Sequence, residues 1–172
     1  TSGSQNNLVQ GNYIGTDVTG LVALGNTNGG MSFWGAGSGN MLGGGAAGAG
    51  NVIAANWRGV TVGNGTVGAT VQGNYIGVGA DGQVLLGNGA EGVRIEGGST
   101  GTRIGTDANG TNDANERNVI SGNVWGISVS GSGTTGTVVA GNTIGLAANG
   151  NTIVANSSYG VSLSNSAGAT MI

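Results

Sequence analysis

The chain has 172 residues, of which 41 are Gly, with no Pro, no Cys and no His. Because Cys is absent, a disulfide framework and a thiolate metal site are excluded. Charged residues make up only 6% and the formal net charge is −3. Four Arg and no Lys are too few to neutralise a nucleic acid backbone or to bind an anionic membrane surface. At this length one domain over residues 1–172 is expected.

Taken in chain order, the first expected strand is Gly-Asn-Tyr-Ile-Gly at residues 11–15, which returns at 73–77 and as Gly-Asn-Thr-Ile-Gly at 141–145. Between these copies Asn-Val-Ile stands at 51–53 and 118–120. A third phrase, Gly followed by alternating apolar and polar residues, begins at residues 30, 59, 92, 126 and 160, in steps of 29, 33, 34 and 34 residues. The sequence therefore predicts a repeat of about 33 residues in which two types of turn alternate.

Each repeat contains short runs that alternate apolar and polar residues and end at Gly or Asn, without helical periodicity. Strands this short cannot bury a face alone, but coiling them in register encloses a continuous core and pairs the backbone between turns. We therefore predict an all-β fold, a right-handed parallel β-helix (solenoid) of about five rungs of ~33 residues. One wall of its core should be the column Phe33, Val62, Ile95, Val129 and Leu163.

A column of asparagines keeps the same period: Asn26, Asn56, Asn88, Asn123 and Asn156. Asn tolerates the left-handed conformation of a tight corner, and its amide can bond the amide above and below. These residues are expected to form a ladder; the alternative is that they offer polar groups to a ligand.

The Gly-Asn-Tyr-Ile-Gly-Thr-Asp phrase at residues 11–17 and the Gly-Asn-Val-Ile phrase at residues 50–53 resemble the right-handed parallel β-helix repeats of large secreted bacterial proteins. These are distantly similar to the pectate-lyase-like β-helix superfamily. The resemblance covers essentially the whole chain. It implies an extracellular or cell-surface setting but no one activity, because the superfamily includes polysaccharide lyases, glycosidases, adhesins and structural stalks.

The motifs that suggest chemistry are weak. Residues 63–68 and 131–136 fit Gly-x-Gly-x-x-Gly, but no helix is expected after either one, so no nucleotide or other cofactor is predicted. Asp17 and Asp107 match in their loops, nearly three rungs apart, which is too far for a carboxylate pair. Each is interpreted as a turn residue that bonds its own backbone. No catalytic residue and no metal ligand is assigned.

Two groups of side chains are candidate sites. The residues before the alternating phrase form an outward column in which Arg58, Glu91, Trp125 and Tyr159 should stack; this column could bind a sugar ring or a protein, or could be a ladder that protects the sheet. The alternative site is the acidic and basic loop cluster Arg103, Asp113, Glu116 and Arg117, which is otherwise a solvated loop.

Neither end of the chain carries an evident cap, and both termini fall in the same strand of the repeat, so the chain is expected either to belong to a longer array or to stack end to end with copies. The leading hypothesis is a non-enzymatic structural or adhesive module of a secreted or cell-surface protein. Its partners would be copies of itself or neighbouring repeats, with carbohydrate as a further candidate. Binding to nucleic acid and insertion into a membrane are not expected. The alternative is a polysaccharide-binding or polysaccharide-cleaving β-helix, and a flat ice-binding face is a third candidate.

Overall fold

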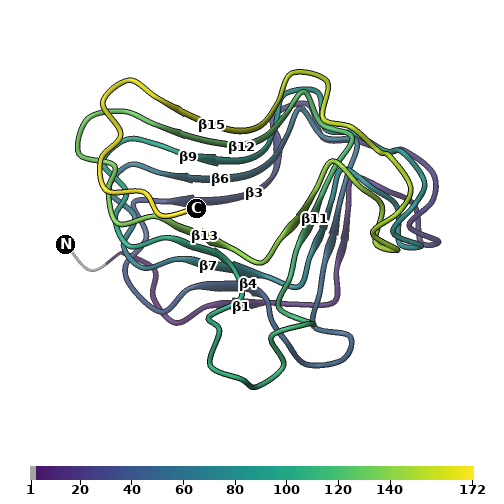
Figure 1. Ribbon diagram of the computed structural model, residues 1–172, viewed down its shortest axis with the longest axis horizontal. Coiled ribbons are helices and arrows are strands. Elements are labelled where there is room, and N and C mark those ends of the chain that lie inside the picture. The colour runs from purple at the N-terminus through teal and green to yellow at the C-terminus, as the bar shows by residue number, and fades with distance from the viewer. Residues whose placement is uncertain (1–2) are drawn as a thin grey trace.

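The computed structural model describes residues 3–172, which form 15 strands and no helix (Figure 1). The strands lie in three five-stranded sheets, each named here after its first strand. The β1 sheet contains β1 (Leu8–Val9), β4 (Met41–Gly43), β7 (Thr70–Gln72), β10 (Arg103–Gly105) and β13 (Val138–Ala140). The β2 sheet contains β2 (Tyr13–Ile14), β5 (Val52–Ile53), β8 (Tyr75–Ile76), β11 (Val119–Ile120) and β14 (Thr143–Ile144). The β3 sheet contains β3 (Gly29–Trp34), β6 (Arg58–Gly63), β9 (Glu91–Ile95), β12 (Trp125–Ser130) and β15 (Tyr159–Ser164).

Every pairing between these strands is parallel, and each strand pairs with its counterpart one turn earlier and one turn later. In the β3 sheet, for example, Val62 is in register with Phe33 on one side and Ile95 on the other. The chain therefore visits the three sheets in order and starts again, which makes five rungs (Figure 1). The predicted all-β parallel solenoid of about five rungs is confirmed.

The rungs alternate between two types, as the two phrases predicted. Rungs 1, 3 and 5 carry a hairpin between the β2 sheet and the β3 sheet, closed by antiparallel bridges from Thr16 to Ala23, from Val78 to Leu85 and from Leu146 to Ile153. Rungs 2 and 4 instead carry a loop between the β1 sheet and the β2 sheet, at residues 44–50 and 106–117. We call them hairpin rungs and loop rungs. Figure 1 shows the three hairpins stacked at the right and the two loops at the bottom.

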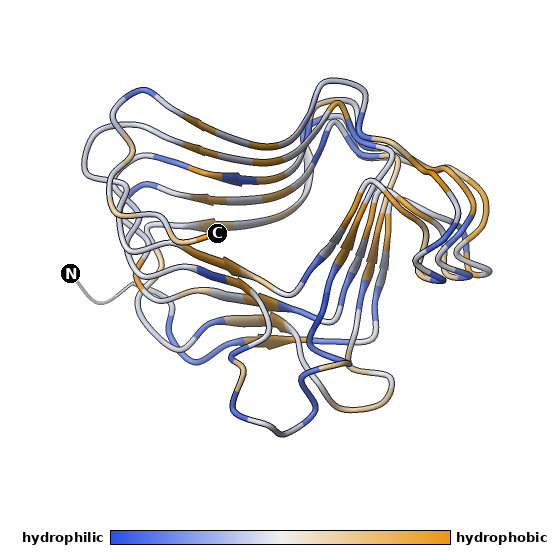
Figure 2. Ribbon diagram, viewed as in Figure 1, coloured by the Kyte–Doolittle hydropathy of each residue, from blue (hydrophilic) through white to orange (hydrophobic). Residues whose placement is uncertain are grey.

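The core lies between the three sheets, whose strands are rich in hydrophobic residues (Figure 2). Four members of the predicted inward column, Phe33, Val62, Ile95 and Val129, are at most 5% exposed. Burial of each such side chain contributes about 1.5–3 kcal/mol. The fifth, Leu163, is 47% exposed, because it lies on the last rung and no further rung covers it.

The predicted asparagine ladder is confirmed at the corner between the β2 and β3 sheets. In each step the side-chain oxygen of one Asn accepts the backbone and side-chain N–H groups of the Asn one rung earlier, as Asn123 Oδ1 does for Asn88 at 3.1 and 2.8 Å. A second ladder, which the sequence analysis missed, occupies the corner between the β1 and β2 sheets: Asn12, Asn51, Asn74, Asn118 and Asn142. These amides satisfy backbone groups that the corners leave unpaired.

The ladders also explain the Gly that ends the Gly-Asn-Tyr-Ile-Gly phrase. Gly77 has a φ of +91°, and a Cβ added there would lie 2.1 Å from the carbonyl oxygen of Ser121 and 2.5 Å from the Asn123 amide. Only Gly permits both this conformation and the close approach of the next rung.

One expectation about the loops is wrong. Asp17 lies in the first hairpin, after a strand of the β2 sheet, whereas Asp107 lies in the loop that follows β10 in the β1 sheet. The two residues therefore occupy different corners, although both follow an Ile-Gly-Thr phrase. Within residues 3–172 there is also no helix long and apolar enough to span a membrane.

Candidate functional site

The predicted outward column forms in register on the β3 sheet. Arg58 follows Gly29, and Trp125 is paired with Glu91 on one side and with Tyr159 on the other. Arg58 Nε donates to Glu91 Oε2 at 2.9 Å. The structure thus brings the four predicted residues together along one face, with an ion pair at one end and two aromatic rings at the other.

The carboxylate of this column is held by two cations. Glu91 is 2% exposed although it points away from the core, because Arg58 bonds one oxygen and Arg94 Nη1 bonds the other at 3.1 Å. Arg94 also pairs with Glu96. Burial alone would lower the pKa of Arg94, but its bonds to Glu96 and then Glu91 outweigh burial and raise that pKa. The network engages both carboxylate oxygens of Glu91, which suits a structural tie better than a general base.

Arg103, at the start of β10, and the loop residues Asp113, Glu116 and Arg117 do not meet as one acid and base group. Glu116 is 7% exposed, and its Oε2 accepts the backbone N–H of Asp107 at 3.0 Å. Asp113 Oδ2 accepts the N–H of Gly110 at 3.1 Å, and Arg103 donates to the carbonyl of Thr106 at 2.9 Å. Among residues 3–172 no ion pair joins any two of the four. Arg103, Asp113 and Glu116 thus bond backbone groups of this loop.

Carboxylates do gather in this loop. Ligand oxygens of Asp107, Asp113 and Glu116 lie within 4.8 Å of one another. Oxygen donors of this kind are the ones that hard cations such as Ca²⁺ prefer, but such a cation needs six or more oxygens, and exposed acidic groups often gather without one. We assign no metal to the cluster.

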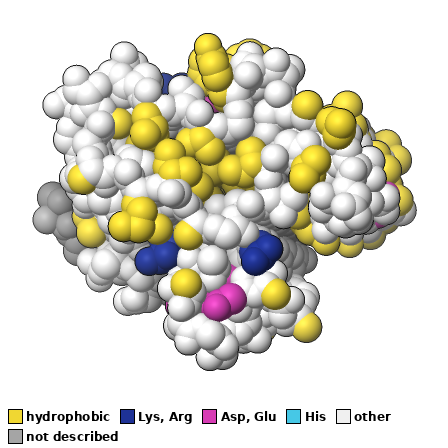
Figure 3. Space-filling model, in the orientation of Figure 1, with side chains coloured by type: hydrophobic (Ala, Val, Ile, Leu, Met, Phe, Trp, Pro, Cys, Tyr) yellow, Lys and Arg dark blue, Asp and Glu magenta, His cyan; other side chains and the backbone are white. Residues whose placement is uncertain are grey.

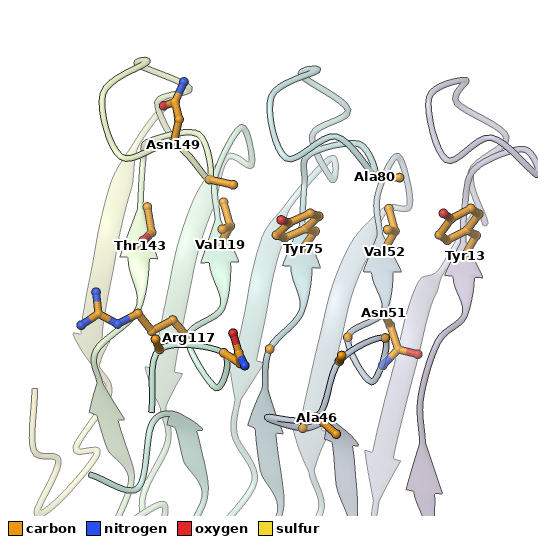
Figure 4. Close-up of a pocket in the computed structure, with 18 of the residues that line it drawn as sticks. Tyr13, Ala46, Asn51, Val52, Tyr75, Ala80, Arg117, Val119, Thr143 and Asn149 are labelled. Atoms are coloured by element: carbon orange, nitrogen blue, oxygen red, sulfur yellow. The ribbon is translucent and has the colours of Figure 1, made fainter. Parts of the chain in front are cut away.

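A groove with a volume of about 720 Å³ lies on the outer face of the β2 sheet. Its floor is the outward residue of each strand in turn: Tyr13, Val52, Tyr75, Val119 and Thr143. Figure 4 shows these five side chains in a row across the neighbouring strands. With adjacent strands about 4.8 Å apart, the floor is roughly 19 Å long.

The alternation of the rungs builds the walls of this groove. One wall is made by the loop rungs, with Ala46, Asn51 and Arg117, and the other by the hairpins, with Ala80 and Asn149 (Figure 4). Of the eight predicted site residues, Arg117 alone lines the groove, where it is the one charged side chain. The groove is thus nearly neutral and mixes apolar rings with small polar groups.

Sequence reasoning missed the two tyrosines of this floor. Tyr13 is 49% exposed, and Tyr75 is partly buried against the small apolar cluster of Val78, Val119, Ala147 and Val154. Both occupy the same place in the Gly-Asn-Tyr-Ile-Gly phrase. An aromatic residue next to a buried Ile in a two-residue strand must point outward, so the alternation could have identified them.

The chain was compared with protein-family models, with curated proteins and with solved structures, and none of them matches. The assignment of the fold therefore rests on the strand pairing described above.

Proposed function

We propose that the chain is a non-enzymatic structural or adhesive β-solenoid module of a secreted or cell-surface protein. The observation that carries this proposal is the engagement of its ionisable side chains in structure. Glu91 is held between Arg58 and Arg94, and Glu116 bonds the backbone of its own loop. General acid or base catalysis needs a group that is free to exchange a proton with substrate.

The two continuous amide ladders support a structural role as well. They tie each rung to the next through buried hydrogen bonds, and a rod built in this way can be extended by adding rungs. The strand edges of the first and last rungs are the surfaces for such growth, with copies of the chain or neighbouring repeats as partners. We also propose that the chain is related to the right-handed parallel β-helix repeats of large secreted bacterial proteins.

The proposal is tested by incubating the chain with a panel of neutral and acidic soluble polysaccharides and measuring reducing ends over time. No increase above the rate in buffer is expected. A steady increase that is lost in Glu116→Gln or Glu91→Gln would overturn the non-enzymatic assignment and favour a polysaccharide-cleaving enzyme.

A second candidate function, carbohydrate binding without cleavage, is favoured by the groove on the β2 sheet. Aromatic rings commonly stack on the apolar face of a pyranose, and Tyr13 and Tyr75 stand two rungs apart, at roughly 10 Å, along a nearly neutral floor. The small polar groups of the walls could bond sugar hydroxyls along an extended chain. A neutral polysaccharide fits this surface better than a highly charged one.

Affinity electrophoresis in gels that contain neutral polysaccharides tests whether binding occurs at the groove on the β2 sheet or at the outward column on the β3 sheet. Tyr13→Ala should weaken retention about fivefold, the loss expected from one aromatic contact of about 1 kcal/mol. Tyr159→Ala removes an exposed aromatic residue from the β3 sheet and is the matched control. Loss of retention in Tyr159→Ala alone would move the site to the predicted column, and no retention of the unmodified chain would exclude this second function.

A further inference from the structure

The hairpins of the solenoid touch one another across two rungs. The N–H of Ala80 in the second hairpin donates to the carbonyl of Gly20 in the first at 3.0 Å, and Ala148 in the third donates to Gly82 in the second at 2.9 Å. A Cβ added at Gly20 or Gly82 would lie 2.5 Å from the next hairpin. Each hairpin therefore fills the whole interval to the next, which is two rungs or roughly 10 Å.

The loop rungs make room for the hairpins. Between the last β2-sheet residue and the ladder Asn, a loop rung has only two residues, Ala54 and Ala55 in rung 2 and Ser121 and Gly122 in rung 4. The N–H of Ala55 donates to the carbonyl of Leu86 at 2.8 Å, so the returning strand of the neighbouring hairpin lies directly against this short corner. A second hairpin at that place would need the volume that the first one occupies.

The opposite corner repeats the same arrangement. There the loops of rungs 2 and 4 meet across rung 3: a Cβ added at Gly45 would lie 2.8 Å from the Cβ of Asn112. The N–H of Gly73, in the hairpin rung between them, donates to the carbonyl of Glu116 at 2.9 Å. Contacts between rungs of the same type therefore establish the two-rung period at two corners of the solenoid.

The last rung presents an open edge to the next one. It is a hairpin rung, and its strand β15 pairs only with β12. Hydrophobic side chains gather in the middle of the face seen in Figure 3, between the strands that Figure 1 labels β13 and β15. Leu163 is 47% exposed, whereas Val129 at the same position one rung earlier is fully buried. Another rung would cover Leu163 within the core.

We infer that this edge accepts a rung of the loop type, with a two-residue corner and an Asn at both ladder positions, and rejects a rung of the hairpin type. The inference rests on the proposed growth through the rung edges and names the partner for it. A direct contact between rung 5 and rung 1 of a second copy would place two hairpins at half their packed interval. Extension therefore proceeds through a neighbouring loop rung.

The chain supplies its own test segments. Met171 is bridged to Val138 in the β1 sheet, so a segment added after Ile172 continues in register if it starts at the equivalent of Gly43 or Gln72. One variant repeats residues 43–71, a loop rung, and a second repeats residues 72–104, a hairpin rung. A third is the second with residues 77–87 replaced by Ala-Ala, which copies the loop-rung corner.

Hydrogen exchange of the β15 amides, together with thermal unfolding, reads out whether the added rung docks. The loop-rung extension should slow exchange of β15 at least about tenfold, the hairpin-rung extension should leave it unchanged, and the trimmed hairpin rung should restore the protection. Equal protection by the hairpin rung would overturn the inference while leaving growth through the edge intact. If none of the three extensions protected β15, the proposed growth itself would be wrong.

Discussion

At the scale of single residues, the buried asparagines hold neighbouring rungs together. Asn123 is 1% exposed; its Oδ1 accepts two N–H groups of Asn88, and its Nδ2 donates to Ile76, Ser121 and Asn156. Asn123→Ala leaves several buried groups without partners, so it should lower the free energy of unfolding by about 3 kcal/mol. Urea unfolding measures this loss. Asn26→Ala, at the exposed end of the same ladder, should cost less than about 1 kcal/mol; an equal loss for both would contradict the ladder account.

Two buried threonines show the opposite situation. The hydroxyl oxygens of Thr102 and Thr137 are buried and have no hydrogen-bond partner, whereas the hydroxyl of Thr66 donates to Phe33 or Gly63 and accepts the N–H of Ala36. Thr102→Val replaces the unpaired hydroxyl by a methyl group and should raise the free energy of unfolding by about 1 kcal/mol. Thr66→Val should lower it by about 1–3 kcal/mol. If Thr102→Val were as destabilising as Thr66→Val, the hydroxyl of Thr102 would have to be bonded in solution.

Of the two asparagine ladders, only one was predicted from the sequence. The ladder that begins at Asn26 was found because its members recur at nearly equal steps. The ladder that begins at Asn12 was missed because its steps are 39, 23, 44 and 24 residues. Each of its two long steps contains a hairpin and the loop that follows it, whereas its two short steps contain neither. In the ladder that begins at Asn26 every step contains either one loop or one hairpin, so the spacing in sequence is nearly equal.

At the scale of elements, the first two hairpins are held by carboxylates and the third by the side-chain amide of Asn149. Asp81 Oδ1 accepts the N–H groups of Gln83 and Val84, both at 2.9 Å, and the bonds to Val84 and Gln83 lower the pKa of Asp81 below its ordinary value of 3.8. A lowered pKa means that the stabilisation is complete above the ordinary value and is lost as the pH falls through the lowered one. The order of the second hairpin should therefore decrease only below about pH 4.

Amide exchange of Val84 between pH 6 and pH 3, corrected for its intrinsic pH dependence, measures this effect. Because Asp81 is close to solvent, the loss should be less than about 1 kcal/mol. Asp81→Asn should remove the pH dependence and leave the rest of the rung unchanged. The same dependence in Asp81→Asn would assign it to another group.

The elements also show why one sequence prediction failed and one site was missed. The Ile-Gly-Thr-Asp phrase at residues 14–17 and 104–107 was treated as one loop type, but a strand of either sheet can end in Ile-Gly, because Gly15 and Gly105 both turn beside an asparagine ladder. Sheet membership depends on the pairing of strands and not on the phrase. The groove was missed because its walls come from loops that are not adjacent in sequence and meet only through the pairing of the strands.

At the scale of the whole molecule, the repeat alone was enough to predict the fold. Regular copies of an alternating phrase specify parallel pairing with the next turn, and each rung contacts few residues beyond its neighbours. What the sequence did not show is the packing of like rungs across the rung between them, as Gly20 and Ala80 do. That contact gives the solenoid a period of two rungs.

A rod whose rungs contact only near neighbours should unfold from its ends. Amides of β6 and β9, which have rungs on both sides, should exchange with nearly the full free energy of unfolding, whereas those of β15 should exchange much faster. Core truncations should follow the same gradient: Ile95→Ala should cost about 2–5 kcal/mol, and Leu163→Ala, at a half-exposed position, clearly less. Native-state hydrogen exchange and urea unfolding of the two variants measure both effects. Equal protection of all five rungs would show instead that the ladders couple them into one cooperative unit.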